Sequence, residues 1–406
     1  MRGCAFFRLS VVIAIANLLA ACSGGGGSTT PTSSTPPGSG GSGPAPPAAT
    51  APVIETQPAN ATATDGQSAT FKVVASGTAP LEYQWAKNSS DISGATAPSY
   101  TTTPTTTSDN GAVFSVKISN AAGSVTSNKA VLTVQALAGL AFGHVVIVME
   151  ENANYSSVVG SSSGMPYLSS LIASYGLATQ YYANTHPSIG NYEMLVTGQV
   201  LTNDDSETPA SFPISVDNIV RELSANDKTW RAYAEDLPSV GYIGGDTGNY
   251  AVRHVPLAYL TDVQDSATGR QGLAPFTQFA PDLASGKLPN FSFVTPNLCN
   301  DAHNCSLATA DAWLKSNIAP LLTSSPFKDD GLLIITFDES ASDNTHGGGR
   351  VAAVFISPAL SKKGYQSTTL YQHQSTLRLM LQGLGINTLP GAAATAPAMS
   401  EFFSTP

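Results

Sequence analysis

Two apolar runs in this chain of 406 residues end on acidic side chains. Residues 145–149 are followed by Glu-Glu-Asn, and residues 332–337 are followed by Asp-Glu. In open α/β sheets, ligands bind in the crevice beyond the carboxyl ends of the strands. Carboxylate and amide oxygens suit a hard or borderline divalent cation. Together the two runs predict one shared cation, although either run alone would equally fit a solvated acid at a strand end.

A serine that precedes a predicted helix is the candidate nucleophile. Ser188 lies in the segment 184–192, just before a helical pattern through residues 193–196. A hydroxyl at a helix N-terminus meets free backbone N–H groups and the positive end of the helix dipole. Ser188 is therefore a candidate for attack on a substrate, or the segment binds an anion. Helix capping would use the same residue types, so that alternative stays open.

Two nearby cysteines enclose polar side chains. Cys299 and Cys305 flank a stretch that contains Asp301 and His303. In an oxidising compartment this spacing predicts a disulfide that closes a small loop. A soft-metal site built from both cysteines and His303 is the alternative, but it lacks the usual ligand spacing.

The chain around these residues alternates strand-like and helical patterns. Between residues 143 and 403, apolar runs are interleaved with helical patterns at residues 215–226, 310–322 and 372–384. This alternation predicts an α/β domain with a largely parallel sheet. The candidate chemistry all falls in this part of the chain.

The preceding segment, residues 53–135, has a different pattern. Short alternating runs such as 69–74 and 113–118 are separated by turn-rich pieces, which predicts a small all-β sandwich. The residues around Trp85 resemble a bacterial immunoglobulin-like domain without its disulfide, with Trp85 as the core tryptophan. The segment shows no clustered aromatic or charged patch, so we expect a spacer rather than a surface or glycan binder. Residues 136–142 are expected to act as a hinge.

The N-terminus resembles an export signal. Residues 1–21 combine two arginines with an apolar stretch that is too short to span a membrane. Leu-Ala-Ala-Cys at residues 19–22 resembles a bacterial lipobox, which implies cleavage before Cys22 and lipid attachment to it. An ordinary cleaved signal is the alternative. Residues 22–52 are rich in Gly, Ser and Pro and predict a disordered linker. We therefore expect a protein held by Cys22 to a membrane of the bacterial cell envelope.

The overall charge argues against nucleic acid as a partner. The formal net charge is −10, and only 11% of residues are charged. Binding to a phosphate backbone needs clustered Lys and Arg, and the sequence contains no basic run.

Five ordered motifs resemble those of a known family. They lie at residues 144–152, 185–192, 296–303, 336–339 and 371–378. They look like the bacterial phosphoesterase family of acid phosphatases and phospholipases C, within the alkaline phosphatase-like superfamily. The resemblance covers about residues 143–403. It implies an alkaline phosphatase-like fold, with a mostly parallel sheet flanked by helices.

The resemblance also implies a site that holds one divalent metal ion. The implied ligands are Glu151, Asn152, Ser188, Asp338 and Glu339. Ca²⁺, Mg²⁺, Mn²⁺, Fe and Zn²⁺ are all compatible with such ligands. Ser188 is implied to attack phosphorus and form a phosphoserine, which water then hydrolyses. Loss of the neighbouring Glu150 is expected to matter less.

Further residues are candidates for phosphate contact and proton donation. Asn191, His186 and Asp301 are expected to bind the phosphate. The candidate catalytic histidines are His254, His303 and His346, since histidine titrates near neutral pH. The chain reads His-Val-Pro-Leu at 254–257 where the family has His-Asn-Pro-Phe, and Gly190 where the family usually has Pro. For His373, packing and phosphate contact are equally compatible with the sequence.

Three functions fit these observations. The first is a metal-dependent acid phosphatase-like phosphomonoesterase at the cell envelope. The second is a phospholipase C, for which Tyr181, Tyr182, Tyr233 and Tyr242 are candidates for a choline-binding aromatic cage. The third is a non-catalytic surface-binding protein built on a decayed enzyme, although the implied site residues are all chemically competent.

Overall fold

The computed structural model of this protein describes residues 48–135, 140–160 and 162–403. These residues form two separate hydrophobic cores, one from residues 63–134 and one from residues 142–402. The predicted export signal, Cys22 and most of the predicted linker lie outside the described residues. Within the described ranges, no helix combines the length and apolar character needed to cross a membrane.

The segment before residue 136 is built from short strands. Its strands are β1 Val53–Thr56, β2 Ala61–Thr64, β3 Thr70–Lys72, β4 Val74–Ser76, β5 Glu82–Lys87, β6 Ser90–Asp91, β7 Ser99–Thr101, β8 Val113–Asn120, β9 Gly123–Thr126 and β10 Ala130–Gln135. One sheet has the order β2-β10-β8-β5-β6 with β9 beside β8, and β1-β4 and β3-β7 form two further pairs. The predicted all-β character is confirmed, while the immunoglobulin-like identity stays a prediction.

Aromatic side chains fill the core of this all-β region. Trp85 is fully buried, and its indole N–H donates to the carbonyl of Ala97 at 2.9 Å. The rings of Phe71 and Phe114 stack with their centroids 4.4 Å apart. Such packing supplies a core without a disulfide, since residues 53–135 contain no cysteine. Trp85 is therefore a core residue, as predicted.

The second region is organised around one eight-stranded sheet. Its strands are β11 His144–Glu150, β12 Gly176–Tyr182, β13 Trp230–Ala234, β14 Leu273–Pro275, β15 Phe291–Thr295, β16 Gly331–Phe337, β17 Ala353–Ile356 and β18 Gln366–Gln372. The order is β14-β13-β15-β11-β16-β17-β12-β18. β17 runs antiparallel to both of its neighbours, and the other pairs are parallel. The predicted, largely parallel sheet is confirmed.

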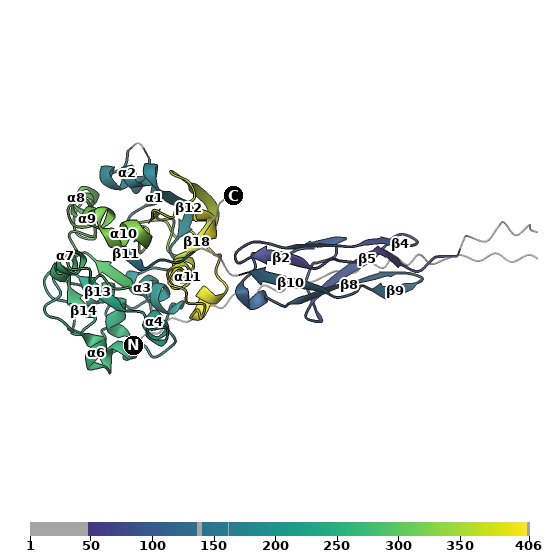
Figure 1. The fold of residues 1–406 in the computed structure, drawn as a ribbon, viewed down its shortest axis with the longest axis horizontal. Helices are drawn as coiled ribbons and strands as arrows, with labels where there is room; N and C mark the ends of the chain where they lie inside the picture. The colour runs from purple at the N-terminus through teal and green to yellow at the C-terminus, as the bar shows by residue number, and fades with distance from the viewer. Residues whose placement is uncertain (1–47, 136–139, 161, 404–406) are drawn as a thin grey trace, which may run out of the picture. The chain divides into compact units, whose positions relative to one another are not determined.

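Helices cover both faces of this sheet. They are α1 Tyr155–Val158, α2 Pro166–Ser174, α3 Ser188–Thr197, α4 Ile219–Ala225, α5 Thr261–Gln264, α6 Ala267–Arg270, α7 Phe279–Ala284, α8 Leu307–Asn317, α9 Ala319–Thr323, α10 Ser325–Asp330 and α11 His373–Gly383. Helices α3, α4 and α11 contact one another, and α2, α8, α9 and α10 form a second packed group. Figure 1 shows the two groups on either side of β11. Because both faces are covered, β16 is buried along its whole length and reads as a continuous apolar run.

The predicted helices exist with shifted ends. The pattern at 215–226 corresponds to α4, which begins only at Ile219 because the side chain of Asn218 caps it by accepting from the N–H of Arg221. The pattern at 310–322 is divided between α8 and α9. Pro320 lies in the first turn of α9 and cannot donate a hydrogen bond to α8, which favours the break.

Candidate active site

The two acid-ended strands lie side by side at the carboxyl edge of the sheet. β11 and β16 are parallel neighbours, with Glu150 opposite Phe337. The N–H of Asp338 donates to the carbonyl of Glu150 at 3.0 Å, and the N–H of Asn152 donates to Asp338 Oδ1 at 3.0 Å. The two strand ends therefore meet at one place, as predicted from their sequence.

Glu151 is the centre of the polar contacts at this edge. Its side chain is fully buried, and its Oε2 accepts hydrogen bonds from Ser188 Oγ at 3.3 Å and Asn152 Nδ2 at 3.2 Å. The hydroxyl of Tyr192 donates to its other oxygen, Oε1. Asn152 has a φ of 47°, in the left-handed region that asparagine tolerates better than most residues. In this conformation its backbone contacts Asp338 while its side chain contacts Glu151.

Ser188 is the first residue of α3, as the sequence led us to expect. It is 3% exposed, and every residue of α3 is buried. Its hydroxyl donates to Glu151, and no cap hydrogen bond comes from the side chain that precedes the helix. The Ser188 hydroxyl thus takes part in the acidic site rather than capping α3. The N–H of Ile189 in the first turn donates to Asp205 Oδ1 at 3.0 Å, and the positive end of the helix dipole lies beside Ser188.

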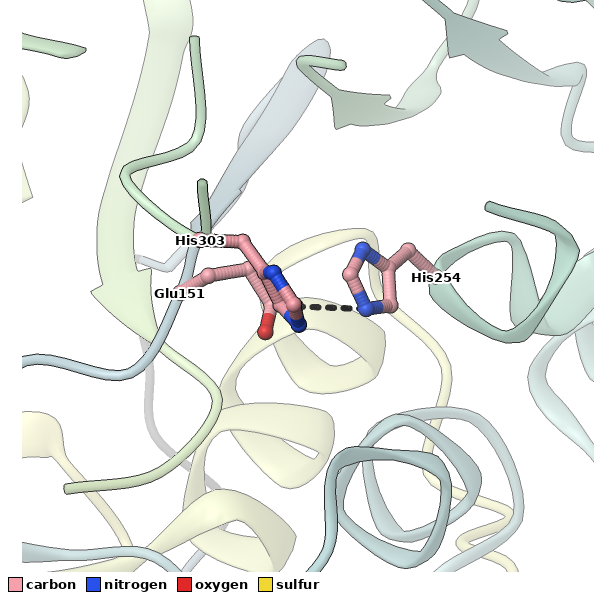
Figure 2. A group of neighbouring side chains, drawn as sticks. All are labelled: Glu151, His254 and His303. Carbon is pink, nitrogen blue, oxygen red and sulfur yellow. Dashed lines mark ion pairs between the residues drawn. The ribbon is translucent and has the colours of Figure 1, made fainter. Parts of the chain in front are cut away.

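Two histidines lie beside Glu151 (Figure 2). His254, from the short 3-10 helix at residues 252–254, is 1% exposed, and its Nε2 lies 3.3 Å from Glu151 Oε1. Its ring stacks on Tyr192 with an interplanar angle of 7°. One ligand atom from each of Glu151, His254 and His303 lies within 4.8 Å of the others. Histidines from two distant loops therefore converge on the first acid-ended strand.

The predicted disulfide is present and holds one of these loops. Cys299 and Cys305 are bonded to each other, which excludes them as ligands of a soft metal. The carbonyl of Asp301, inside this loop, accepts from the N–H of Glu151 at 2.8 Å. The Asp301 side chain is buried and accepts from the N–H of His303 at 2.8 Å. The disulfide loop thus brings both Asp301 and His303 to the end of β11.

The buried acids raise one another's proton affinity. Burial, together with the nearby charges of Asp338 and Asp301, holds the pKa of Glu151 well above its usual range. Burial raises the pKa of Asp301 to about 7, and burial and the Asp338 charge raise the pKa of Glu339 to about 8. Asp338 Oδ2 is buried without a hydrogen-bond partner among the described residues. Such a set of acids is expensive to ionise unless a cation is bound between them.

The donor atoms at this edge fit a divalent cation. Carboxylate, amide and hydroxyl oxygens with imidazole nitrogens suit a hard or borderline metal ion. The structure gathers one group of candidate ligands within the described residues, formed by Glu151, His254 and His303. The predicted set of Glu151, Asn152, Ser188, Asp338 and Glu339 stays a prediction, although hydrogen bonds link Glu151 to Ser188 and Asn152 and link Asn152 to Asp338. His254 was not among the predicted ligands, and His303 was considered as a ligand only together with the two cysteines.

Asn191 has other partners than the predicted phosphate. Its Oδ1 accepts from the N–H groups of Asn184 and Thr185 at 2.8 and 3.1 Å, and its Nδ2 donates to the carbonyl of Thr185 at 2.8 Å. The residue therefore fixes the loop before α3. Only its second amide hydrogen is left for a ligand. Its role in phosphate binding stays a prediction.

The other two predicted histidines lie in different surroundings. His186 Nδ1 is 2.8 Å from Glu339 Oε2, and its Nε2 contacts the carbonyl of Asp343 at 3.1 Å. His186 is therefore an ion-pair partner of a predicted metal ligand. His346 is exposed, and its ring packs edge-on against Tyr182. The catalytic role of His346 stays a prediction.

Sequence reasoning missed Tyr192 and underestimated the burial of Glu150. Tyr192 follows Ser188 by four residues, so both lie on one face of α3. That spacing was a signal for a second residue of the site. Glu150 is fully buried, both of its carboxylate oxygens lack partners among the described residues, and burial raises its pKa well above the usual range. It is not a solvated strand end.

The phosphoesterase-like part of the chain is similar in sequence to known proteins. A model of the Phosphoesterase family matches residues 161–387, more than half of the chain. An acid phosphatase of Aspergillus fumigatus is 33% identical over 262 residues, which cover 62% of this chain and 57% of that enzyme. A phosphatidylinositol-3-phosphatase of Mycobacterium tuberculosis is 31% identical, over 64% of this chain and 83% of that protein.

Among solved structures, a protein of the alkaline phosphatase superfamily from Vibrio parahaemolyticus is 13% identical with a TM-score of 0.46, over 64% of this chain and 72% of that one. The chain spans little more than half the length of the fungal enzyme.

Proposed function

The chain belongs to the phosphoesterase family, and from this premise we propose that it is a metal-dependent hydrolase of phosphate monoesters with an alkaline phosphatase-like fold. One observation carries the proposal. Ser188 is the first residue of a buried helix, and its Oγ lies 3.3 Å from Glu151 Oε2. The acids around it can be ionised at the same time only if a cation is bound between them. This combines a nucleophile, an anion-stabilising helix end and cation ligands in one place.

The chemistry follows from this geometry in two displacements. Ser188 Oγ loses its proton to the acid with which it is hydrogen-bonded and attacks phosphorus, and the bond to the ester oxygen breaks. A bound divalent cation would lower the pKa of the hydroxyl and offset the charge of the phosphate. Water then loses a proton and attacks the phosphoserine, the bond from phosphorus to Oγ breaks, Oγ regains the proton held by the acid, and phosphate leaves. The positive end of the α3 dipole would stabilise the phosphate oxygens in both steps.

The two neighbouring histidines suit different roles. Burial, followed by the nearby Arg253 charge, lowers the pKa of His254 to about 3, so this ring is neutral near pH 7. A neutral buried imidazole serves as a ligand or a hydrogen-bond donor. His303 is exposed and lies within reach of Glu151. We assign His303 the donation of a proton to the leaving alkoxide.

The structure gives little support to a choline-binding phospholipase C. Two of the four candidate cage tyrosines, Tyr181 and Tyr233, are fully buried, and their hydroxyls bond to other side chains. Tyr242 packs edge-on against Tyr250. A cage for a quaternary ammonium group needs several open aromatic faces around one point. These tyrosines therefore favour the monoesterase over that alternative.

The decisive experiment compares hydrolysis of p-nitrophenyl phosphate and p-nitrophenylphosphorylcholine across pH, before and after chelation. We expect turnover of the monoester that chelation abolishes and added divalent metal restores. Rapid acid quenching during turnover is expected to yield a peptide with phosphate on Ser188, measured by mass spectrometry. Full activity of a Ser188→Ala variant would refute the covalent mechanism. Wild-type protein that turns over neither substrate with any divalent metal would favour the surface-binding function.

The place of action is also part of the proposal. We propose attachment to a membrane of the cell envelope through Cys22, with the all-β region as a spacer for the phosphoesterase region. The supporting feature is the lipobox-like sequence at residues 19–22. A Cys22→Ser variant is expected to move from the membrane fraction to the soluble fraction. Unchanged fractionation would contradict lipid attachment.

A further inference from the structure

A buried histidine connects the second acid-ended strand to the interior of the protein. His373 begins α11 and is fully buried. Its Nε2 lies 2.7 Å from the carbonyl oxygen of Asp338, and its Nδ1 lies 3.0 Å from the hydroxyl of Tyr181. The sequence left His373 between packing and phosphate contact. In the structure it bonds the backbone of a predicted metal ligand.

The direction of these hydrogen bonds follows from their chemistry. A carbonyl oxygen can only accept, so His373 Nε2 donates to Asp338. In the neutral ring Nδ1 is then an acceptor, and the hydroxyl of Tyr181 donates to it. The Tyr181 oxygen in turn accepts from Thr376 Oγ1, 2.7 Å away. The hydrogen bonds therefore all point the same way. They lead from Thr376 of α11 to Tyr181 of β12, and then through His373 to the carbonyl of Asp338 after β16.

The bonded carbonyl lies between two predicted metal ligands. It belongs to the peptide that joins Asp338 to Glu339. The peptide on the other side of Asp338 is held as well, because its N–H donates to the carbonyl of Glu150 at 3.0 Å. The backbone is thus fixed on both sides of Asp338. Rotation of the peptide after Asp338 would redirect the side chains of both acids.

We propose that His373, Tyr181 and Thr376 are positioning residues that orient Asp338 and Glu339 toward a common divalent cation. This inference rests on the proposed function, since it requires a metal at these acids. Contacts that orient metal ligands are worth roughly 10- to 100-fold in metal affinity. The chain of hydrogen bonds should therefore affect metal binding more than it affects folding.

The neighbouring strand offers a matched control. Tyr181 of β12 pairs with Tyr371 of β18, and the two are 0% and 1% exposed. The Tyr371 hydroxyl bonds to Glu401 at 2.6 Å instead of His373. Tyr181→Phe and Tyr371→Phe each delete one buried hydroxyl from the same pair of strands. Only the first deletion breaks the chain that leads to Asp338.

The experiment measures binding of Mn²⁺ to the full chain by electron paramagnetic resonance of the free ion. We expect Tyr181→Phe to weaken binding about tenfold and Tyr371→Phe to change it less than about twofold. Both variants should lose similar thermal stability when metal-free, because each loses a buried hydroxyl that has two hydrogen-bond partners. This difference separates positioning of ligands from a general structural role.

A second pair of variants tests the donor itself. His373→Leu removes the donor to Asp338 and is expected to weaken Mn²⁺ binding about 10- to 100-fold. His373→Gln keeps an amide N–H near the position of Nε2 and is expected to recover most of that loss. If His373→Leu does not fold, the two tyrosine variants still decide the question.

The outcomes distinguish this inference from the proposed function. Wild-type Mn²⁺ affinity in Tyr181→Phe, with metal-dependent activity intact in the wild type, overturns the positioning role and leaves the function standing. Equal losses in Tyr181→Phe and Tyr371→Phe also overturn it. Wild-type protein that binds no Mn²⁺ and hydrolyses no phosphate ester overturns both.

Discussion

A partly exposed carboxylate of the all-β region and a buried carboxylate of the phosphoesterase region are treated in opposite ways by their surroundings. In the all-β region, Asp109 lies 2.6 Å from Lys87. Burial alone would raise the pKa of Asp109, but hydrogen bonds from Lys87 and Thr106 outweigh burial and lower it. In the phosphoesterase region, burial and the Asp338 charge raise the pKa of Glu339 to about 8. The first carboxylate is stabilised in its charged form by the fold itself, and the second is not.

This difference shows that the buried acids of the phosphoesterase region are not explained by their contribution to folding stability. The core around Trp85 is apolar and aromatic, and it is explained by packing alone. The carboxyl edge of the large sheet buries Glu151, Asp301 and Asp338 next to one another. Perturbed acids gathered in one place are typical of functional sites. Variants of the two regions should therefore have separable effects on activity and on stability.

The largest expected effect is on catalysis. Ser188→Ala should lower kcat for p-nitrophenyl phosphate by about 10⁴-fold or more, because loss of a nucleophile removes the covalent route. Thermal unfolding should change little. Ser292→Ala is a suitable control, since Ser292 is the buried second residue of β15, away from the carboxyl end of the strand. A comparable loss of kcat in both variants would contradict a specific role of Ser188.

The next effect is on stability of the all-β region. Trp85→Ala should cost about 3–5 kcal/mol, since it removes a fully buried aromatic side chain. Calorimetric unfolding measures the loss, and kcat of the protein at a temperature where it remains folded should equal that of the wild type. A fall in kcat under those conditions would show that the all-β region contributes to catalysis.

A smaller effect concerns how the folding stability of the metal-free protein depends on pH. The folded-state pKa is raised to about 7 for Asp301 and about 8 for Glu339, so the folded state binds these protons more tightly than the unfolded state. Their contribution to stability is full below the unfolded pKa values, near 4, and is lost as pH rises through 7 and 8.

The midpoint temperature of the metal-free protein should therefore fall by several degrees between pH 5 and pH 8, since 1 kcal/mol corresponds to about 2–4 °C in a domain of this size. Added Mn²⁺ should stabilise the protein most at pH 8, where it no longer competes with these protons. Scanning calorimetry at both pH values measures the effect. A midpoint that rises toward pH 8 without metal would contradict it.

The smallest expected effect distinguishes two adjacent acids. Glu150→Gln should change kcat by less than about tenfold, because the Glu150 carboxylate has no hydrogen-bond partner among the described residues. Glu151→Gln should nearly abolish activity, because Glu151 accepts from Ser188. Burial raises the pKa of Glu150 well above its usual range, so Glu150→Gln should also reduce the loss of stability of the metal-free protein as the pH rises. Equal losses of kcat in both variants would place Glu150 in the site.

Much of the site could be predicted because it follows directly from strand ends and helix starts. Glu151, Asp338 and Ser188 all occupy such positions, and the parallel register of β11 and β16 brings the two acids together. The histidines could not be ranked in this way. Nothing in the sequence separates His254, fully buried against Tyr192, from His346, exposed beside Tyr182. His254 lies in a short 3-10 helix and His346 in a loop, and the positions of both depend on long-range contacts.

The sequence by itself determined the alternation of elements, the two acid-ended strands and the Cys299–Cys305 loop, because each is a local pattern read along the chain. Only the tertiary structure decided that His303 meets Glu151, that His186 pairs with Glu339, and that His373 holds the carbonyl of Asp338. The physical reason is distance along the chain. These pairs are separated by more than 30 residues, so their contacts exist only after the sheet and its loops have packed.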